Sequence, residues 1–139
     1  MTKPKELFLC TGNSCRTQMA EAFLRDLAGD RFEVTSAGDK FTDVDPDAVE
    51  AMRELGIDIS AQTPKNIDHF LTERFGYVIS LCDRQKERSC PVFHGAIWRA
   101  NWDVDNPARA QSAEEHRALV RQARDQIRER VIEFVTKHQ

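Results

Sequence analysis

Apolar residues occur along this chain in short runs that alternate with longer segments of helical spacing. The short runs have the length and composition of β-strands and cover residues 6–10, 32–36, 76–81 and 96–98. Helical signals appear at residues 17–27, 47–55 and 66–71 and in the stretch that begins at Ser112. Strands that alternate with helices predict an α/β fold, in which a four-stranded parallel sheet carries helices on both faces.

The ends of two predicted helices carry recognisable signals. Pro46 occupies the favoured first turn of the helix at residues 47–55, and Gly56 follows its last residue. Ser112 and Glu115 have the spacing of a capping box at the start of the last helix. This helix should be long, because its apolar face continues through Leu119, Val120, Ala123, Ile127, Val131, Phe134 and Val135.

The length of 139 residues favours a single domain over residues 1–139, because it is enough chain for one hydrophobic core. The net charge of −3 argues against a nucleic-acid-binding surface. No apolar stretch approaches the roughly 20 residues that span a bilayer, and the first residues lack the apolar core of a signal peptide. We therefore expect a cytoplasmic monomer with no nucleic-acid or membrane partner.

The segment between the first strand and the first helix has the composition of an oxyanion-binding loop. Free backbone N–H groups and the positive end of the helix dipole favour an anion at a helix N-terminus. Gly12 and Asn13 permit a tight turn, and the guanidinium of Arg16 matches a tetrahedral oxyanion. The residues that we predict to bind this oxyanion are Thr11, Gly12, Asn13, Ser14, Cys15, Arg16 and Thr17.

Cys10 stands directly before this loop, and we predict that its sulfur is the attacking atom. A helix N-terminus and a nearby cation favour the thiolate form of a cysteine, and the hydroxyl of Thr17 is a plausible donor to that sulfur. Cys15 is expected to pack behind the loop, with only its backbone amide facing the anion. The alternative is an ordinary strand–helix turn with two buried cysteines. The position of the loop, its composition and Arg16 together argue against it.

Two further cysteines, Cys82 and Cys90, flank a very polar segment at residues 83–89. Cys10 and Cys82 each lie at the end of a predicted strand, so parallel strands would bring both to one edge of the sheet. Basic residues around Cys82 and Cys90 favour redox chemistry over packing. The spacings C-x4-C and C-x7-C match no common zinc pattern, and we predict no metal site.

These residues resemble the low-molecular-weight protein tyrosine phosphatase fold, and more closely its thioredoxin-coupled arsenate reductase branch, which serves arsenical resistance. The likeness covers nearly the whole chain. The anion loop specifies the wider fold, whereas the pair of cysteines after the strand at residues 76–81 specifies the reductase branch. Further matching segments are Met19-Ala20-Glu21-Ala22, Thr35-Ser36-Ala37-Gly38, Cys90-Pro91, and Trp102 ahead of Asn106-Pro107-Ala108.

The resemblance implies a relay of cysteines with no bound cofactor and with thioredoxin as the external reductant. Cys10 attacks arsenate, and the loop amides and Arg16 hold the adduct. Cys82 then attacks Cys10, arsenite leaves and a Cys10–Cys82 disulfide results. Cys90 next attacks Cys82, which frees Cys10 and leaves a Cys82–Cys90 disulfide for thioredoxin. Coupling to mycothiol or glutaredoxin is an alternative for this last step.

The chain departs from the pattern of this family at two positions. The aspartate that serves as general acid before the proline is replaced by Asn106, whose amide does not titrate. Asp105 is our candidate for the role, and Asp103 is the alternative. The second departure is Lys65, which takes the place of an aspartate in a potassium site that some members build with the residues corresponding to Asn13, Glu21 and Ser36. An ammonium near Glu21 would replace the charge of that metal.

Two other functions fit parts of the sequence. The first is a phosphatase that hydrolyses phosphate monoesters through a phospho-intermediate on Cys10, because arsenate and phosphate are near-isosteric. Phosphatases of this fold carry tyrosines after the Asp-Pro pair, whereas this chain has Ala108 and Arg109 there and its one tyrosine is Tyr77. The second is an oxyanion- or arsenite-binding protein or a thiol redox sensor, which would bind its ligand without turnover and would need no second cysteine pair.

Overall fold

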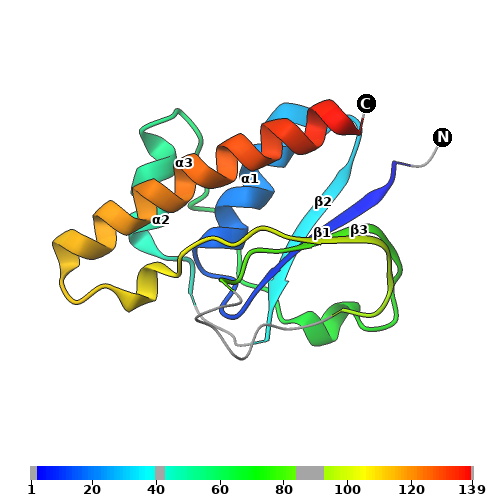
Figure 1. Cartoon of the computed structure of the whole chain (residues 1–139), viewed down its shortest axis with the longest axis horizontal. Helices are drawn as coiled ribbons and strands as arrows, with labels where there is room; N and C mark the ends of the chain where they lie inside the picture. Colours follow the sequence, from blue (N-terminus) through cyan, green and yellow to red (C-terminus); the bar gives the residue numbers. More distant parts are fainter. Residues whose placement is uncertain (1–2, 40–42, 84–92, 139) are drawn as a thin grey trace.

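The computed structural model describes residues 3–39, 43–83 and 93–138. The strands are β1 (Lys5–Cys10), β2 (Glu33–Gly38), β3 (Phe75–Ser80) and β4 (Ala96–Asn101). The α-helices are α1 (Arg16–Ala28), α2 (Pro46–Arg53) and α3 (Ala113–Lys137), and two 3-10 helices are η1 (Ile67–Phe70) and η2 (Pro107–Arg109) (Figure 1). Among these residues, no helix has both the length and the apolar character needed to cross a membrane.

The four strands form one sheet in the order β2-β1-β3-β4, and every neighbouring pair is parallel. Parallel strands have their carboxyl ends at one edge, which is where such sheets bind ligands. Cys10 pairs with Gly38 at this edge, and the amide of Leu81 donates to the carbonyl of Leu9 at 2.8 Å. The chain that leads into Cys82 therefore runs beside the end of β1. The predicted fold class is confirmed.

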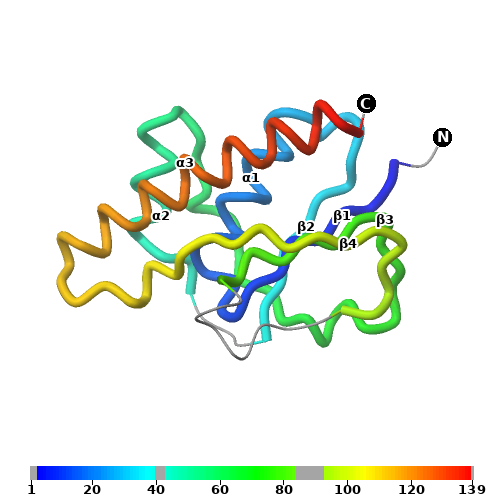
Figure 2. Tube along the Cα trace, in the orientation of Figure 1, coloured from blue at the N-terminus to red at the C-terminus, as the bar shows by residue number. Residues whose placement is uncertain are grey.

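The three α-helices pack together on one face of the sheet. Helix α3 runs across α1 and α2 (Figure 2), and their shared core with the sheet includes Phe8, Met19, Leu24, Ile79 and Ile127. The opposite face is covered by η1 and its flanking segments, with Leu7, Leu9, Ile67, Val78 and Phe93 in a smaller cluster. Helices thus cover both faces as predicted, although the second face has only a short 3-10 helix.

The sequence signals at the helix ends correspond to real caps. The carboxylate of Asp45 accepts a hydrogen bond from the amide of Asp47 at 2.9 Å, and Pro46 is the first residue of α2. The hydroxyl of Ser112 accepts from the amide of Glu115 at 3.0 Å at the start of α3. These bonds satisfy amides that have no partner within the helix, and so they fix where each helix begins.

The structure differs from the expected elements mainly after residue 98. Strand β4 continues to Asn101, three residues beyond the predicted end. The sequence did not indicate this part because β4 is an edge strand with exposed side chains, among them Ile97 and Arg99, and so has little apolar alternation. Helix η2 was not predicted at all. It is a single turn whose cap is Asn106, with the side-chain oxygen accepting from the amide of Ala108 at 3.1 Å.

Candidate functional site

The predicted anion loop joins β1 to α1 at the carboxyl edge of the sheet. Cys10 is the last residue of β1 and only 2% exposed, and Arg16 is the first residue of α1. Between them, Asn13 has a φ of 50°, which is a left-handed conformation that asparagine tolerates better than most residues. The loop therefore lies at a helix N-terminus, as the sequence indicated, and has the sharp turn that concentrates backbone N–H groups.

Gly38 at the end of β2 lets the loop lie directly against the sheet. A Cβ atom at this position would lie 2.8 Å from the amide nitrogen of Asn13 and 2.9 Å from the carbonyl oxygens of Cys10 and Thr11. All three are backbone atoms, so they could not move aside without reshaping the loop. Only glycine fits here, which explains physically why the segment Thr35-Ser36-Ala37-Gly38 ends in glycine.

Two groups that can donate hydrogen bonds contact the sulfur of Cys10. The backbone amide of Asn13 donates to Sγ at 3.3 Å, and the hydroxyl of Thr17 also lies 3.3 Å from it. The side-chain amide of Asn13 donates to the same hydroxyl at 2.8 Å, which leaves the hydroxyl proton available for the sulfur. The predicted contact between Thr17 and Cys10 is confirmed.

Arg16 is 3% exposed and is held in one orientation by backbone carbonyls. Its Nη1 donates to the carbonyl oxygens of Leu81 and Val104, both at 3.0 Å. These carbonyls belong to the segments that follow β3 and β4, so the guanidinium ties the loop to both. A buried, fixed cation at the start of α1 adds positive charge to the loop amides.

The other cysteines have distinct environments. Cys15 is buried in the core on the helical face, where burial, and secondarily the charge of Asp45, raises the pKa of its thiol well above the ordinary value. It packs behind the loop as expected. Cys82 is fully buried and disulfide-bonded, whereas Cys10 and Cys15 are free thiols. Cys90 lies outside the described residues.

The two candidate general acids lie in the segment after β4, whose backbone also holds Arg16. The carboxylate of Asp105 forms an ion pair with Arg109 and is 38% exposed. The carboxylate of Asp103 accepts a hydrogen bond from the side chain of Asn101 at 2.7 Å. The choice of Asp105 stays a prediction.

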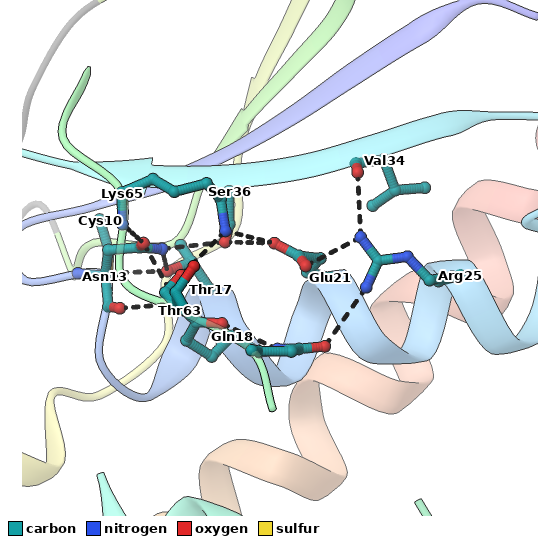
Figure 3. A network of polar contacts seen from close by, with 11 residues as sticks. Cys10, Asn13, Thr17, Gln18, Glu21, Arg25, Val34, Ser36, Thr63 and Lys65 are labelled. Carbon is teal, nitrogen blue, oxygen red and sulfur yellow. Dashed lines mark hydrogen bonds and ion pairs between the residues drawn. The ribbon is translucent and has the colours of Figure 1, made fainter. Parts of the chain in front are cut away.

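A polar network lies behind the loop and is centred on the side chain of Asn13 (Figure 3). Its Nδ2 donates to the hydroxyl of Ser36 at 2.9 Å, and this hydroxyl donates to Oε1 of Glu21 at 2.6 Å. The buried carboxylate of Glu21 contacts two cations. The ammonium of Lys65 lies 3.3 Å from Oε1, and the guanidinium of Arg25 lies 2.8 Å from Oε2. The ion pair expected at Lys65 is therefore present.

The potassium site implied by the resemblance does not fit this arrangement. The ammonium of Lys65 contacts Oε1 of Glu21 and donates to the carbonyl oxygen of Thr63 at 3.0 Å. The backbone amide of Lys65 donates to Oδ1 of Asn13 at 2.6 Å. The oxygens that would ligate a cation thus already receive protein donors, and a potassium ion among them would be repelled by the ammonium.

Two glutamines that the sequence did not reveal as functional complete the network. Gln18 is fully buried, and its side-chain amide donates to the carbonyl oxygens of Asn13 at 3.0 Å and of Thr63 at 3.1 Å. Gln62 in turn donates to Oε1 of Gln18 at 2.8 Å. The only signal in the sequence is a polar residue directly before the apolar stripe of α1, and this signal names no partner.

A second polar cluster lies near the loop, where His116 of α3 sits between two carboxylates. Its Nε2 lies 3.1 Å from Asp45, and its Nδ1 lies 2.6 Å from Asp47. These three side chains are close enough together to hold a metal ion. Each ring nitrogen, however, already faces a carboxylate, so the three groups partner one another. The cluster joins the starts of α2 and α3.

Comparison with known proteins identifies relatives along nearly the whole chain. The family model described as low molecular weight phosphotyrosine protein phosphatase matches residues 5–139. The arsenate reductase of Halalkalibacterium halodurans is 42% identical over 135 residues, 96% of each chain. The arsenate reductase of Bacillus subtilis is 44% identical over 128 residues, 91% of each chain.

Solved structures give the same answer for the fold. An arsenate reductase in the phosphate binding state aligns with a TM-score of 0.79 and 37% identity over 98% of both chains. A thioredoxin-dependent arsenate reductase of Corynebacterium glutamicum aligns with a TM-score of 0.69 and 26% identity, over 99% of this chain and 64% of that one.

Proposed function

The chain belongs to the low molecular weight phosphotyrosine protein phosphatase family, and within this family we propose that it is an enzyme that reduces arsenate to arsenite with Cys10 as the nucleophile. One observation carries the proposal: the parallel register places the chain entering Cys82 beside the end of β1, where Cys10 and the anion loop lie. A phosphatase needs no second cysteine at this edge. The curated relatives named arsenate reductase favour the same reading.

Arsenate binds where the loop gathers positive potential. The amides of residues 11–16 surround its oxygens, and the start of α1 adds the positive end of the helix dipole. Arg16 supplies charge from a fixed position, because Leu81 and Val104 hold its guanidinium. Preorganised donors of this kind stabilise a charged adduct without having to reorganise during the reaction.

The reaction then proceeds by exchange at sulfur. The Cys10 thiolate attacks the arsenic, and one arsenate oxygen leaves as water after protonation. Cys82, as a thiolate, attacks the sulfur of Cys10, so that an S–S bond forms and the S–As bond breaks. The electron pair of that bond stays on arsenic, which is reduced from As(V) to As(III) as the two cysteines are oxidised. Such exchange needs an attacking thiolate and an accessible partner sulfur.

Regeneration of Cys10 needs a third thiol, for which we propose Cys90. Its thiolate attacks Cys82, releases the Cys10 thiolate and forms a Cys82–Cys90 disulfide, which the dithiol of thioredoxin reduces. In the structure Cys82 is disulfide-bonded while Cys10 and Cys15 are free. This is the pattern that the relay predicts once Cys10 has been released. A thioredoxin-dependent relative supports the choice of reductant.

Disulfide mapping after one turnover tests the relay. Reduced protein mixed with arsenate and quenched with an alkylating agent should give one arsenite per chain and a disulfide at Cys82 but not at Cys15. In Cys90→Ser the disulfide should instead remain between Cys10 and Cys82. Phosphate in place of arsenate is the matched control and should yield no disulfide. Release of arsenite while every cysteine is recovered in the alkylated form, and hence as a free thiol, would refute the relay.

The general acid can be identified by comparing two isosteric variants. We expect Asp105→Asn to lower kcat for arsenate reduction by about 10²-fold or more, because it removes the proton for the leaving oxygen. Asp103→Asn should have a much smaller effect. The measurement is steady-state turnover with thioredoxin, thioredoxin reductase and NADPH across pH 5–9. Near-normal turnover in Asp105→Asn, with loss in Asp103→Asn, would assign the role to Asp103.

Phosphatase activity is the second candidate, and the family description and the phosphate-bound neighbour favour it. The aromatic group that would grip a phosphotyrosine is missing after Pro107, where the chain has Ala108 and Arg109. Tyr77 packs against Phe32 on the helical face of the sheet. Hydrolysis of an aryl phosphate faster than arsenate reduction, under equal conditions, would favour the phosphatase.

A further inference from the structure

We propose that Lys65 is a built-in cation that positions the nucleophile, so that the site works without a monovalent metal ion. Lys65 does not touch the sulfur of Cys10, and it acts through Glu21 and Asn13. The inference rests on the proposed role of Cys10 as the nucleophile, and it concerns only how that thiol is prepared.

Lys65 contacts the loop support through three of its own groups. Its ammonium binds Oε1 of Glu21 and the carbonyl oxygen of Thr63. Its backbone amide donates to Oδ1 of Asn13, and its carbonyl accepts from the amide of Gly38 at 3.0 Å. The side chain therefore anchors a backbone segment that contacts both the anion loop and the end of β2.

The backbone contact determines which way the amide group of Asn13 points. A backbone N–H can only donate, so the atom that faces Lys65 is the oxygen Oδ1. The nitrogen Nδ2 must then face the hydroxyls of Thr17 and Ser36, as observed (Figure 3). Thr17 accepts from Nδ2 and keeps its own proton for the sulfur of Cys10. The backbone amide of Lys65 makes the shorter contact to Oδ1, and the side chain of Gln18 donates to the same atom at 3.2 Å. Through Asn13, the segment at Lys65 thus helps to decide whether Cys10 receives a second donor.

The charge of Lys65 is needed because Glu21 is buried. Glu21 is 4% exposed, and its Oε1 accepts a hydrogen bond from the hydroxyl of Ser36 at 2.6 Å. The groups facing it are Ser36, the cations Lys65 and Arg25, and the buried carboxyl of Glu6, whose own pKa is raised in part by Glu21. Burying an acidic group beside a second acidic group is costly unless cations face it, and Lys65 and Arg25 are the cations that face Glu21.

Arg25 does not perform the same task. It binds the outer oxygen Oε2, and its side chain is about half exposed. Lys65 binds Oε1, the oxygen that also holds Ser36 and so belongs to the chain of hydrogen bonds leading to Cys10. Loss of Lys65 would therefore leave the inner oxygen without a cation and release the segment that orients Asn13.

The rate at which iodoacetamide alkylates Cys10 in the reduced protein, measured by mass spectrometry of its peptide, tests the proposal. The wild type should react at equal rates in sodium and potassium chloride of equal ionic strength. Lys65→Ala should react about tenfold more slowly in sodium, the size expected for one hydrogen bond to a charged group. Potassium should restore part of that rate by entering the space between Glu21 and Thr63. Lys65→Arg should retain most of the wild-type rate.

The matched control is Lys5→Ala, which removes a partly exposed lysine from an ion pair with Glu73 outside the loop network. It should react like the wild type in both salts. If circular dichroism shows that Lys65→Ala does not fold, Lys65→Gln replaces it, since glutamine keeps a long polar side chain without the charge.

Three results would overturn the proposal. They are a wild type that reacts faster in potassium than in sodium, a neutral variant at Lys65 that reacts like the wild type in sodium, and a slow neutral variant that potassium does not accelerate. The alkylation involves neither arsenate nor thioredoxin. Failure of the proposed reductase activity would therefore show in turnover assays alone and leave this measurement interpretable.

Discussion

Replacing Cys10 with serine is expected to abolish arsenate reduction, with a loss in kcat/KM of at least about 10⁴-fold. A serine hydroxyl is not ionised at neutral pH, and the loop has no base beside it to remove its proton, as far as the described contacts of Cys10 show. Serine also cannot form a disulfide, so no electrons could pass from protein to arsenic. This variant should therefore bind the oxyanion without reducing it.

The measurement combines turnover in the thioredoxin-coupled assay with oxyanion binding by calorimetry. Cys10→Ser should still bind arsenate, because the donors of the loop and Arg16 do not depend on the sulfur atom. Cys82→Ser is the matched variant at the same edge of the sheet. It should form the adduct with Cys10 and then stop, releasing no arsenite. Turnover of Cys10→Ser within tenfold of the wild type would rule out Cys10 as the nucleophile.

Replacing Glu6 with glutamine is expected to stabilise the protein at neutral pH. Glu6 lies in the central strand β1 and is 0% exposed, and neither of its carboxyl oxygens has a hydrogen-bond partner in the structure described. Burial, and secondarily the charge of Glu21, raises the pKa of this carboxyl well above the ordinary value. The folded protein therefore keeps Glu6 protonated at pH values where the unfolded chain has ionised it.

The sign of the pH dependence follows from that difference. The unfolded chain releases the proton at about pH 4.3, whereas the folded protein still binds it, so folding takes up a proton above that pH. The contribution of Glu6 to stability is complete below about pH 4.3 and is lost as the pH rises through the folded pKa. Over that window the free energy of unfolding should fall by about 1.4 kcal/mol per pH unit. Glutamine does not titrate, so this part of the slope should vanish.

Urea unfolding of the reduced protein at pH 5, 6, 7 and 8 measures this effect. The gap between Glu6→Gln and the wild type should widen with pH, and Glu6→Leu should gain about 1–3 kcal/mol more by removing an unsatisfied polar group. The control is Glu33→Gln, an exposed glutamate on the neighbouring strand, which should change stability by less than about 0.5 kcal/mol at every pH. Parallel curves for Glu6→Gln and the wild type would show that Glu6 is solvated or paired.

Much of the fold follows from local sequence. The strand that ends at Cys10, the turn at Asn13 and the start of α3 at Ser112 each depend on neighbouring residues, through periodicity, backbone freedom and caps. These are signals that a short window of sequence contains. The sequence predicts only the first part of the edge strand β4 and does not predict the turn η2. Exposed side chains and a single turn leave too little hydrophobic pattern in a short window to be detected.

The candidate site likewise combines features that the local sequence predicts with features that depend on the tertiary structure. The sequence alone determined that a cysteine, a tight loop and an arginine stand at a helix N-terminus, and from these residues it predicts a tetrahedral oxyanion and a sulfur nucleophile. The sequence also predicted Cys82 at the same edge as Cys10 and favoured redox chemistry for Cys82 and Cys90. The resemblance added the order of the relay and the unusual Lys65. Only the tertiary structure decided that Arg16 is held by the carbonyls of Leu81 and Val104, 65 and 88 residues away along the chain.

The tertiary structure also decided that Lys65 helps to orient Asn13 while it pairs with Glu21, and that the buried carboxyl of Glu6 has no hydrogen-bond partner among the described residues. Contacts of this kind join residues that are distant in sequence, and their geometry depends on how the strands register and how the helices pack. The chemical identity of a side chain determines which hydrogen bonds and ion pairs it can form. Its partner, direction and burial are set only when the remaining chain has folded around it.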